Sequence, residues 1–163
     1  MIDDFVFGKV SGPGGSWDLL FVHGLTGDPL STWTNSSSTE PEGGFWPLWI
    51  AKDIPSSNIY TLGYQASIFA RWAKKESALH EQAYETLEFL AGNDIGTRPI
   101  AIVAHSLGGL VAKQLLRSGM ESDDDGWQKV AANVKQIIFL ATPHSGSSLS
   151  DILKFFAPGI VSD

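Results

Sequence analysis

An α/β fold with three layers and a mostly parallel central sheet is the fold class that this 163-residue sequence predicts. Short apolar runs at 17–22, 58–64, 100–104 and 134–140 are typical of strands that are buried on both faces. Between such runs lie segments with apolar residues at helical spacing, of which 75–90 is the longest. Strands that alternate with helices favour a parallel sheet joined by right-handed crossovers.

The composition indicates one globular domain over residues 1–163, with 43% hydrophobic and 18% charged residues. The net charge of −7 argues against a nucleic-acid partner, because phosphate binding needs a basic face. Cysteine is absent, which excludes disulfides and cysteine-based metal sites and favours a cytoplasmic location. The sequence shows no signal peptide and no apolar run long enough to cross a membrane.

Other segments have weaker patterns. Residues 5–10 predict an edge strand, and 28–44 form a long polar loop of the kind that carries function in a compact domain. Residues 45–50 predict a short amphipathic helix, and a second short helix is expected at 127–134. The acidic run 121–126 predicts a solvated loop between helices.

The segment 99–119 carries the most informative pattern, because it predicts a buried strand, a sharp turn and a helix. Ser106 lies at the turn, flanked two residues away on each side by Ala104 and Gly108. Small residues at these two positions allow the strand and the helix to approach closely at a strained turn, which is typical of a nucleophile elbow. Gly119 is expected to end the helix.

Two further strand ends have unusual sequences. His23-Gly24-Leu25 follows one buried strand, and Thr142-Pro143-His144 follows another, whereas His105-Ser106-Leu107 follows the strand of the elbow. Ligands of parallel α/β sheets bind beyond the carboxyl ends of the strands. We therefore expect these three segments to meet at one rim, which is the candidate functional site.

The segments FVHGLTGD, AHSLGG and ATPHSGS, in this order and spacing, resemble the α/β-hydrolase superfamily. The chain looks most like its lipase/esterase-like branch, which includes the SERAC1-type and GPI inositol-deacylase (PGAP1-like) proteins. The resemblance covers roughly residues 17–150 and implies an α/β-hydrolase-like sheet that lacks its last strands. One departure is Ala104, where glycine is commoner.

The resemblance implies roles for the rim residues. Ser106 is the nucleophile, and the backbone N–H groups of Leu25 and Leu107 form the oxyanion hole. His23, Gly24 and His144 lie at the rim of the site. The non-catalytic alternatives are that His23 stabilises its loop through hydrogen bonds and that His144 has a structural role.

A general base for Ser106 is missing from these expectations. The family order is Ser, acid, His, and His144 is the only histidine that follows Ser106, whereas the family's base follows two further strands. His105 is expected to point into packing, and His80 toward solvent. The chain is therefore interpreted as the N-terminal part of a longer protein with further domains, or else as a triad-deficient relative.

The sequence also offers no well-supported candidate for the carboxylate that would orient a catalytic histidine. Asp123, Asp124 and Asp125 belong to the acidic run, which predicts a solvated loop, and Asp151 follows the last predicted strand. No histidine and carboxylate spacing suggests a metal site, and no cofactor is expected.

The function that these patterns favour is a serine hydrolase that cleaves small-molecule or lipid carboxylic esters through an acyl-enzyme. The alternative is a non-catalytic module that binds a lipid or a partner protein on the hydrolase scaffold. Within the enzyme class, a peptidase or a thioesterase stays open. Five aromatic residues could form either ordinary core or an acyl groove, namely Trp33, Trp46, Trp49, Phe155 and Phe156.

Overall fold

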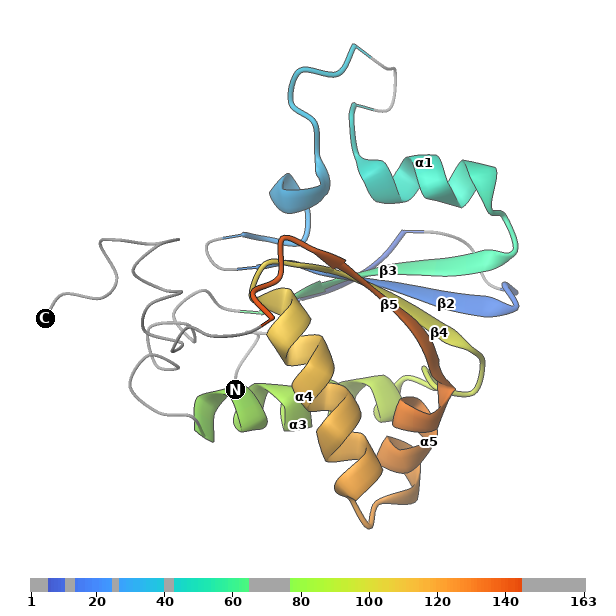
Figure 1. Cartoon of the computed structure of the whole chain (residues 1–163). Coiled ribbons are helices and arrows are strands. Elements are labelled where there is room, and N and C mark those ends of the chain that lie inside the picture. Colours follow the sequence, from blue (N-terminus) through green and yellow to red (C-terminus); the bar gives the residue numbers. More distant parts are fainter. Residues whose placement is uncertain (1–5, 11–13, 25–26, 40–42, 65–76, 145–163) are drawn as a thin grey trace, which may run out of the picture.

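The computed structural model describes residues 6–10, 14–24, 27–39, 43–64 and 77–144 of the chain. A five-stranded sheet lies at its centre, with helices on both faces (Figure 1). The three-layer α/β architecture expected from the sequence is therefore confirmed.

The sheet has the strand order β1-β3-β2-β4-β5. Four strands are parallel to one another, and β1 pairs antiparallel with β3 at one edge. The strands are β1 (Val6–Lys9), β2 (Trp17–Val22), β3 (Ser57–Gly63), β4 (Ile100–His105) and β5 (Val134–Leu140). Since β4 pairs with both β2 and β5, the elbow strand has a neighbour on each side.

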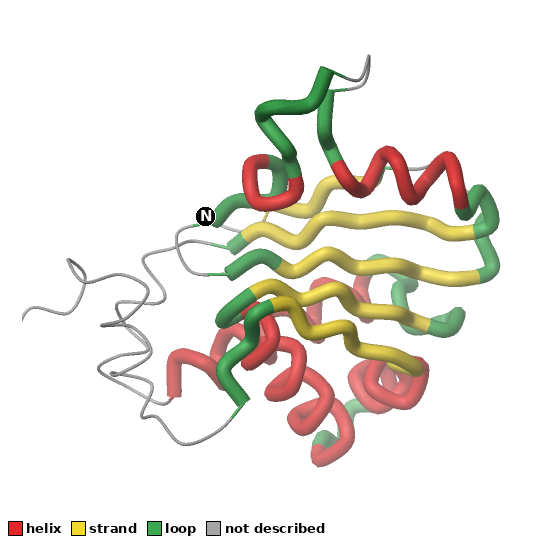
Figure 2. Tube along the Cα trace, turned by 45° about the horizontal axis from the view of Figure 1, so that its top comes forward, coloured by secondary structure: helices red, strands yellow, loops and turns green. Residues whose placement is uncertain are grey.

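Three helices cover one face of the sheet, namely α3 (Ser77–Gly92), α4 (Gly108–Glu121) and α5 (Asp125–Asn133). The short 3-10 helix η1 (Ser31–Trp33) and helix α1 (Trp46–Asp53) lie on the opposite face. Figure 2 shows the sheet between these two sets of helices. The expected helix after residue 45 is confirmed, and it ends before Pro55.

Alternate residues of the central strands pack into two separate hydrophobic clusters. Leu20 and Ile102 belong to the cluster beneath α3, α4 and α5, whereas Phe21 and Val103 belong to the cluster that includes Trp33. This division follows from the two-residue repeat of a strand, which sends successive side chains to opposite faces. Burial on both faces explains why these strands are continuous apolar runs.

In the C-terminal half, the expectation for Gly119 is wrong, and the second short helix is confirmed but begins two residues earlier than expected. Gly119 does not end α4, which continues to Glu121. Instead a Cβ on Gly119 would lie 2.7 Å from the Cβ of Ala131, so this glycine permits α5 to pack closely against α4. The second short helix begins at Asp125, inside the acidic run, because Asp124 caps it by accepting a hydrogen bond from the backbone N–H of Trp127 at 2.9 Å.

Strand β5 is also less buried than expected. It is the last strand of the described sheet, and its residues are half-buried or exposed, with Ile138 39% exposed. The apolar run at 134–140 is thus an open edge in the part of the chain that the structure describes.

None of the described helices is long and apolar enough to cross a membrane.

Candidate active site around Ser106

Ser106 occupies a left-handed turn between β4 and α4, with a φ of 51°. Such a conformation costs a residue with a side chain about 1–3 kcal/mol and persists only where its surroundings impose it. The serine is 3% exposed, and its N–H donates a 2.8 Å hydrogen bond to the carbonyl oxygen of Leu140 on β5. The geometry is that of the strained strand-turn-helix expected from the sequence.

Glycines on both sides of the turn make close approaches that no larger residue allows. A Cβ on Gly24 would lie 2.7 Å from the Cβ of Ser106, and a Cβ on Gly108 would lie 2.6 Å from the carbonyl oxygen of Val22. A Cβ on Gly109 would overlap the side chain of Thr142. The ends of β2, β4 and β5 therefore meet at Ser106, as the sequence predicts for the rim.

Leu107 follows the serine and is completely buried at the N-terminus of α4. The first N–H groups of a helix have no acceptor within the helix, and they lie at the positive end of its dipole. The Leu107 N–H is therefore suited to stabilise a developing negative charge beside Ser106. The other expected donor, Leu25, lies outside the described residues, whereas its neighbour Gly24 lies against Ser106.

His23 lies next to the elbow, but its ring is 0% exposed. Its Nδ1 lies 2.8 Å from the carbonyl oxygen of Gly24, and its Nε2 accepts a 3.3 Å hydrogen bond from the backbone N–H of Tyr64. The Tyr64 ring stacks on the imidazole at 4.3 Å, and its hydroxyl donates to the His23 carbonyl oxygen. Burial lowers the pKa of His23, which fits a neutral ring that braces the loop.

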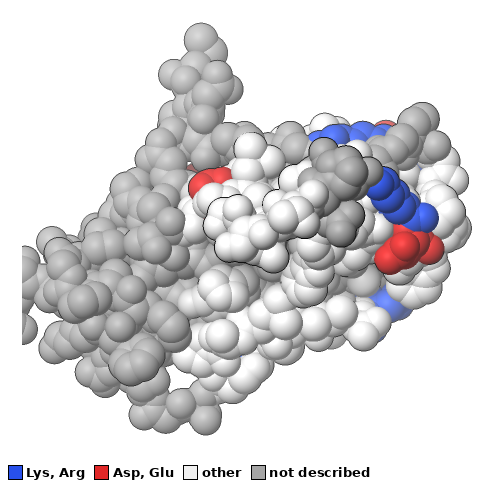
Figure 3. Space-filling model, turned by 90° about the horizontal axis from the view of Figure 1, so that it is seen from above, with Lys and Arg blue, Asp and Glu red and all other residues white. Residues whose placement is uncertain are grey.

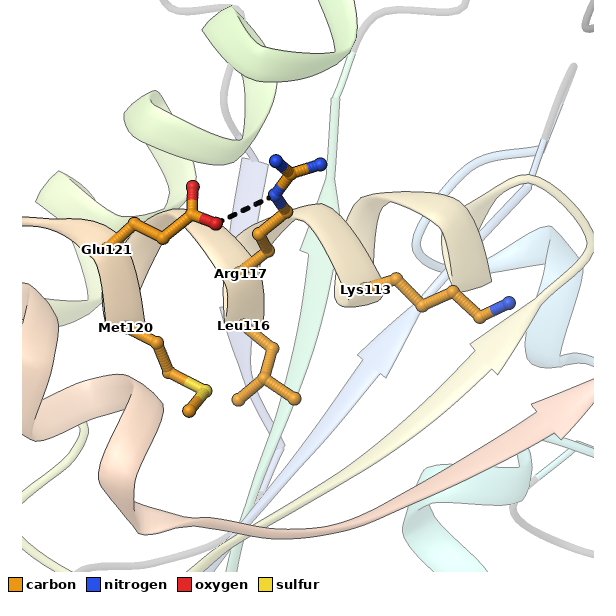
Figure 4. A pocket seen from close by; sticks show the side chains of 5 residues that line it. All are labelled: Lys113, Leu116, Arg117, Met120 and Glu121. Atoms are coloured by element: carbon orange, nitrogen blue, oxygen red, sulfur yellow. Dashed lines mark hydrogen bonds and ion pairs between the residues drawn. The ribbon is translucent and has the colours of Figure 1, made fainter.

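His144 lies at the end of β5 on the side of α4. It is exposed, its Nδ1 is 2.8 Å from the Nζ of Lys113, and its ring meets the Phe139 ring edge-on at 4.8 Å. Figure 4 shows that Lys113 extends away from the Arg117–Glu121 ion pair on the same helix. The hydrogen bonds of His23 and His144 are thus made with groups other than Ser106.

The remaining candidates lie elsewhere. His105 is half-buried and lines a hollow beside Trp33 rather than filling the core, and burial lowers its pKa. His80 on α3 is half-buried instead of fully solvent-facing. The acidic run is exposed, as expected, and it contains the cap of α5. Asp151, Phe155 and Phe156 lie outside the described residues.

One partner of the site residues was not expected from the sequence. Tyr64 contacts His23 from 41 positions away in the chain. Thr142, in contrast, lies at the expected rim, where its side chain is so close to Gly109 that a Cβ there would overlap it. Within the described ranges, no cluster of three or more His, Asp or Glu side chains could hold a metal ion.

Comparisons with known proteins place the chain among proteins described as putative serine esterases. Residues 19–157 match the family described as "Putative serine esterase (DUF676)". The chain is similar to protein SERAC1 of Homo sapiens, at 32% identity over 149 residues, and of Mus musculus, at 31%. Each alignment covers 82% of this chain and 22% of the relative, so the chain spans less than a quarter of these proteins. No solved structure matches it.

Proposed function

We propose that this chain, which belongs to the DUF676 family, is the nucleophile-bearing part of a serine hydrolase that cleaves carboxylic esters. The observation that carries the proposal is Ser106 itself, a residue with φ of 51° at a turn enclosed by the ends of three parallel strands. A strained conformation of this kind is expected where it serves a function. The esterase description of the matched family supports the same reaction class.

In the proposed reaction, Ser106 Oγ attacks the carbonyl carbon of the ester while a base removes the hydroxyl proton. The oxyanion of the tetrahedral intermediate accepts hydrogen bonds from the N–H groups of Leu107 and Leu25. Collapse expels the alcohol, which takes up the proton, and leaves an acyl group on Ser106. Attack by water then releases the carboxylic acid and restores the serine.

The base and its orienting acid are proposed to come from further parts of a longer protein. Two observations support this arrangement. The SERAC1 relatives are more than four times as long as the matched region, and β5 leaves an open, partly apolar edge in the described sheet. An exposed apolar strand edge is normally paired or covered in a complete domain.

The test is ester hydrolysis by the full-length natural protein, with p-nitrophenyl butyrate as the substrate. Ser106→Ala should lower the rate by at least about 10³-fold, because loss of a nucleophile removes the acyl-enzyme route. Ser118→Ala is the matched control, since Ser118 is a buried serine on the adjacent helix whose hydroxyl is bonded to Gln114. Equal rates for the wild type and Ser106→Ala would refute the proposal.

A second candidate is a module that binds a lipid or protein without catalysis. The observation in its favour is that the hydrogen bonds of His23 and His144 in the described structure go to other groups than Ser106. If Ser106→Ala preserved the biological activity of the full-length protein, this second function would replace the first.

A further inference from the structure

A hollow of about 330 Å³ lies beside the elbow, on the face of the sheet that carries η1 and α1. Three tryptophans line it, Trp33, Trp46 and Trp49, together with His105 at the end of β4 and Leu140 at the end of β5. We call it the tryptophan hollow. Its volume is within the range of small-molecule sites, which are mostly apolar and preformed.

None of the described residues that line the tryptophan hollow carries a charge. Its other members are two threonines, an asparagine and a glycine, and burial lowers the pKa of His105, which keeps that ring neutral near pH 7. Figure 3, which looks onto this side of the molecule, shows white atoms across most of the described surface and charged atoms mainly toward the right edge. A neutral, apolar ligand is therefore favoured over an ionic one.

Ring contacts hold the walls in place. Trp33 is 4% exposed, it meets the Phe21 ring edge-on at 5.0 Å, and it stacks with Trp46 at 6.3 Å. His105 meets Trp33 edge-on at 6.4 Å. Trp46 is 40% exposed, so a large aromatic surface stays open to solvent in the described structure. Such a preformed apolar surface binds alkyl groups with little loss of side-chain entropy.

The tryptophan hollow is joined to Ser106 through two of its walls. His105 directly precedes the serine, and the carbonyl oxygen of Leu140 accepts the 2.8 Å hydrogen bond from the Ser106 N–H. Of the two halves of an ester, the acyl half is the one that becomes bonded to the serine. A binding surface whose walls adjoin the nucleophile therefore serves that half.

We propose that the tryptophan hollow binds the neutral alkyl chain of the acyl group, so that the preferred substrates are esters of medium-chain fatty acids. This inference rests on the proposed esterase function. It predicts that Trp46 contributes to the choice of acyl chain, because its exposed ring is available to an alkyl chain on Ser106.

The test compares p-nitrophenyl octanoate with p-nitrophenyl acetate on the full-length natural protein. In Trp46→Ala the ratio of kcat/KM for octanoate to that for acetate should fall about tenfold, since only the longer chain reaches the lost ring. Trp17→Ala is the matched control, because Trp17 is similarly exposed, at 43%, but lies at the start of β2, whereas the end of this strand lies near Ser106. The ratio should be unchanged in this control.

A binding measurement separates this inference from the proposed function. In the Ser106→Ala background, the neutral ester methyl 11-bromoundecanoate should quench tryptophan fluorescence, and the added Trp46→Ala change should weaken its affinity about tenfold. An unchanged acyl preference in Trp46→Ala, with hydrolysis still dependent on Ser106, would overturn the tryptophan hollow as an acyl site and leave the esterase function in place. Hydrolysis that survives Ser106→Ala would refute the proposed function, in which Ser106 is the nucleophile, whereas Trp46-dependent quenching would still support alkyl binding.

Discussion

Replacement of Gly108 by alanine should damage the site by forcing β2 away from the elbow helix. The new Cβ would lie 2.6 Å from the carbonyl oxygen of Val22 and closer still to that of His23. Both are backbone atoms of a strand and its continuation, and β2 is paired on one side with β3 and on the other with β4. No flexible side chain can move aside to relieve the overlap.

The expected cost follows from this rigidity. Overpacking typically lowers the free energy of unfolding by about 1–3 kcal/mol, and backbone overlap places Gly108→Ala near the upper limit. For a chain of this size, a loss of about 3 kcal/mol corresponds to a fall in the unfolding midpoint of about 6–12 °C. Any catalytic rate should fall more than stability alone explains, because a shift of about 1 Å in a catalytic group costs about 10²-fold.

Thermal unfolding followed by circular dichroism measures the effect, with Gly92→Ala as the control. A Cβ on Gly92, the last residue of α3, meets nothing within 4 Å, and alanine favours helix more than glycine does. The control should match or exceed the wild type in stability. A midpoint for Gly108→Ala within about 1 °C of the wild type would refute the close approach of the elbow to β2.

Three further effects follow from the contacts described above. Asp18→Asn should lower the free energy of unfolding by about 1.5–3 kcal/mol, because the buried Asp18 carboxylate accepts hydrogen bonds from Asn58 at 2.8 Å and from the partly exposed Arg98 guanidinium at 3.1 Å. Glu121→Gln is the control, since it breaks an exposed ion pair worth under about 1 kcal/mol. Burial lowers the pKa of His23, so the neutral ring should contribute fully to the free energy of unfolding above about pH 6.5, and this contribution should be lost as the pH falls through the lowered pKa. Melting curves of His23→Gln should not show this loss. Asp124→Ala should cost about 1 kcal/mol by removing the cap of α5, and chemical denaturation should show little effect of Asp123→Ala.

The central strands and the elbow could be predicted because their sequences are locally decisive. Burial on both faces requires the continuous apolar runs of β2 and β4, and only small residues fit around Ser106. The edge strand β1 was also predicted, although its antiparallel direction was not. In each case the chemistry of a short segment limits the structure that it can form.

Other features depend on partners that are distant in the sequence. A glycine can end a helix or allow a neighbouring helix to pack closely, and the sequence alone does not distinguish the two roles. The role of Gly119 is decided by its contact with Ala131. The apolar run of β5 does not reveal whether a further strand covers its edge. Likewise, the bracing of His23 depends on Tyr64, which is 41 positions away.

The most direct test of the central claim is the site of covalent labelling by a fluorophosphonate in the full-length natural protein. Peptide mass spectrometry should find the adduct on Ser106 in the peptide that spans the elbow, and Ser106→Ala should abolish labelling without lowering the unfolding midpoint. Labelling at another serine, or undiminished labelling of the Ser106→Ala variant, would contradict the assignment of Ser106 as the nucleophile.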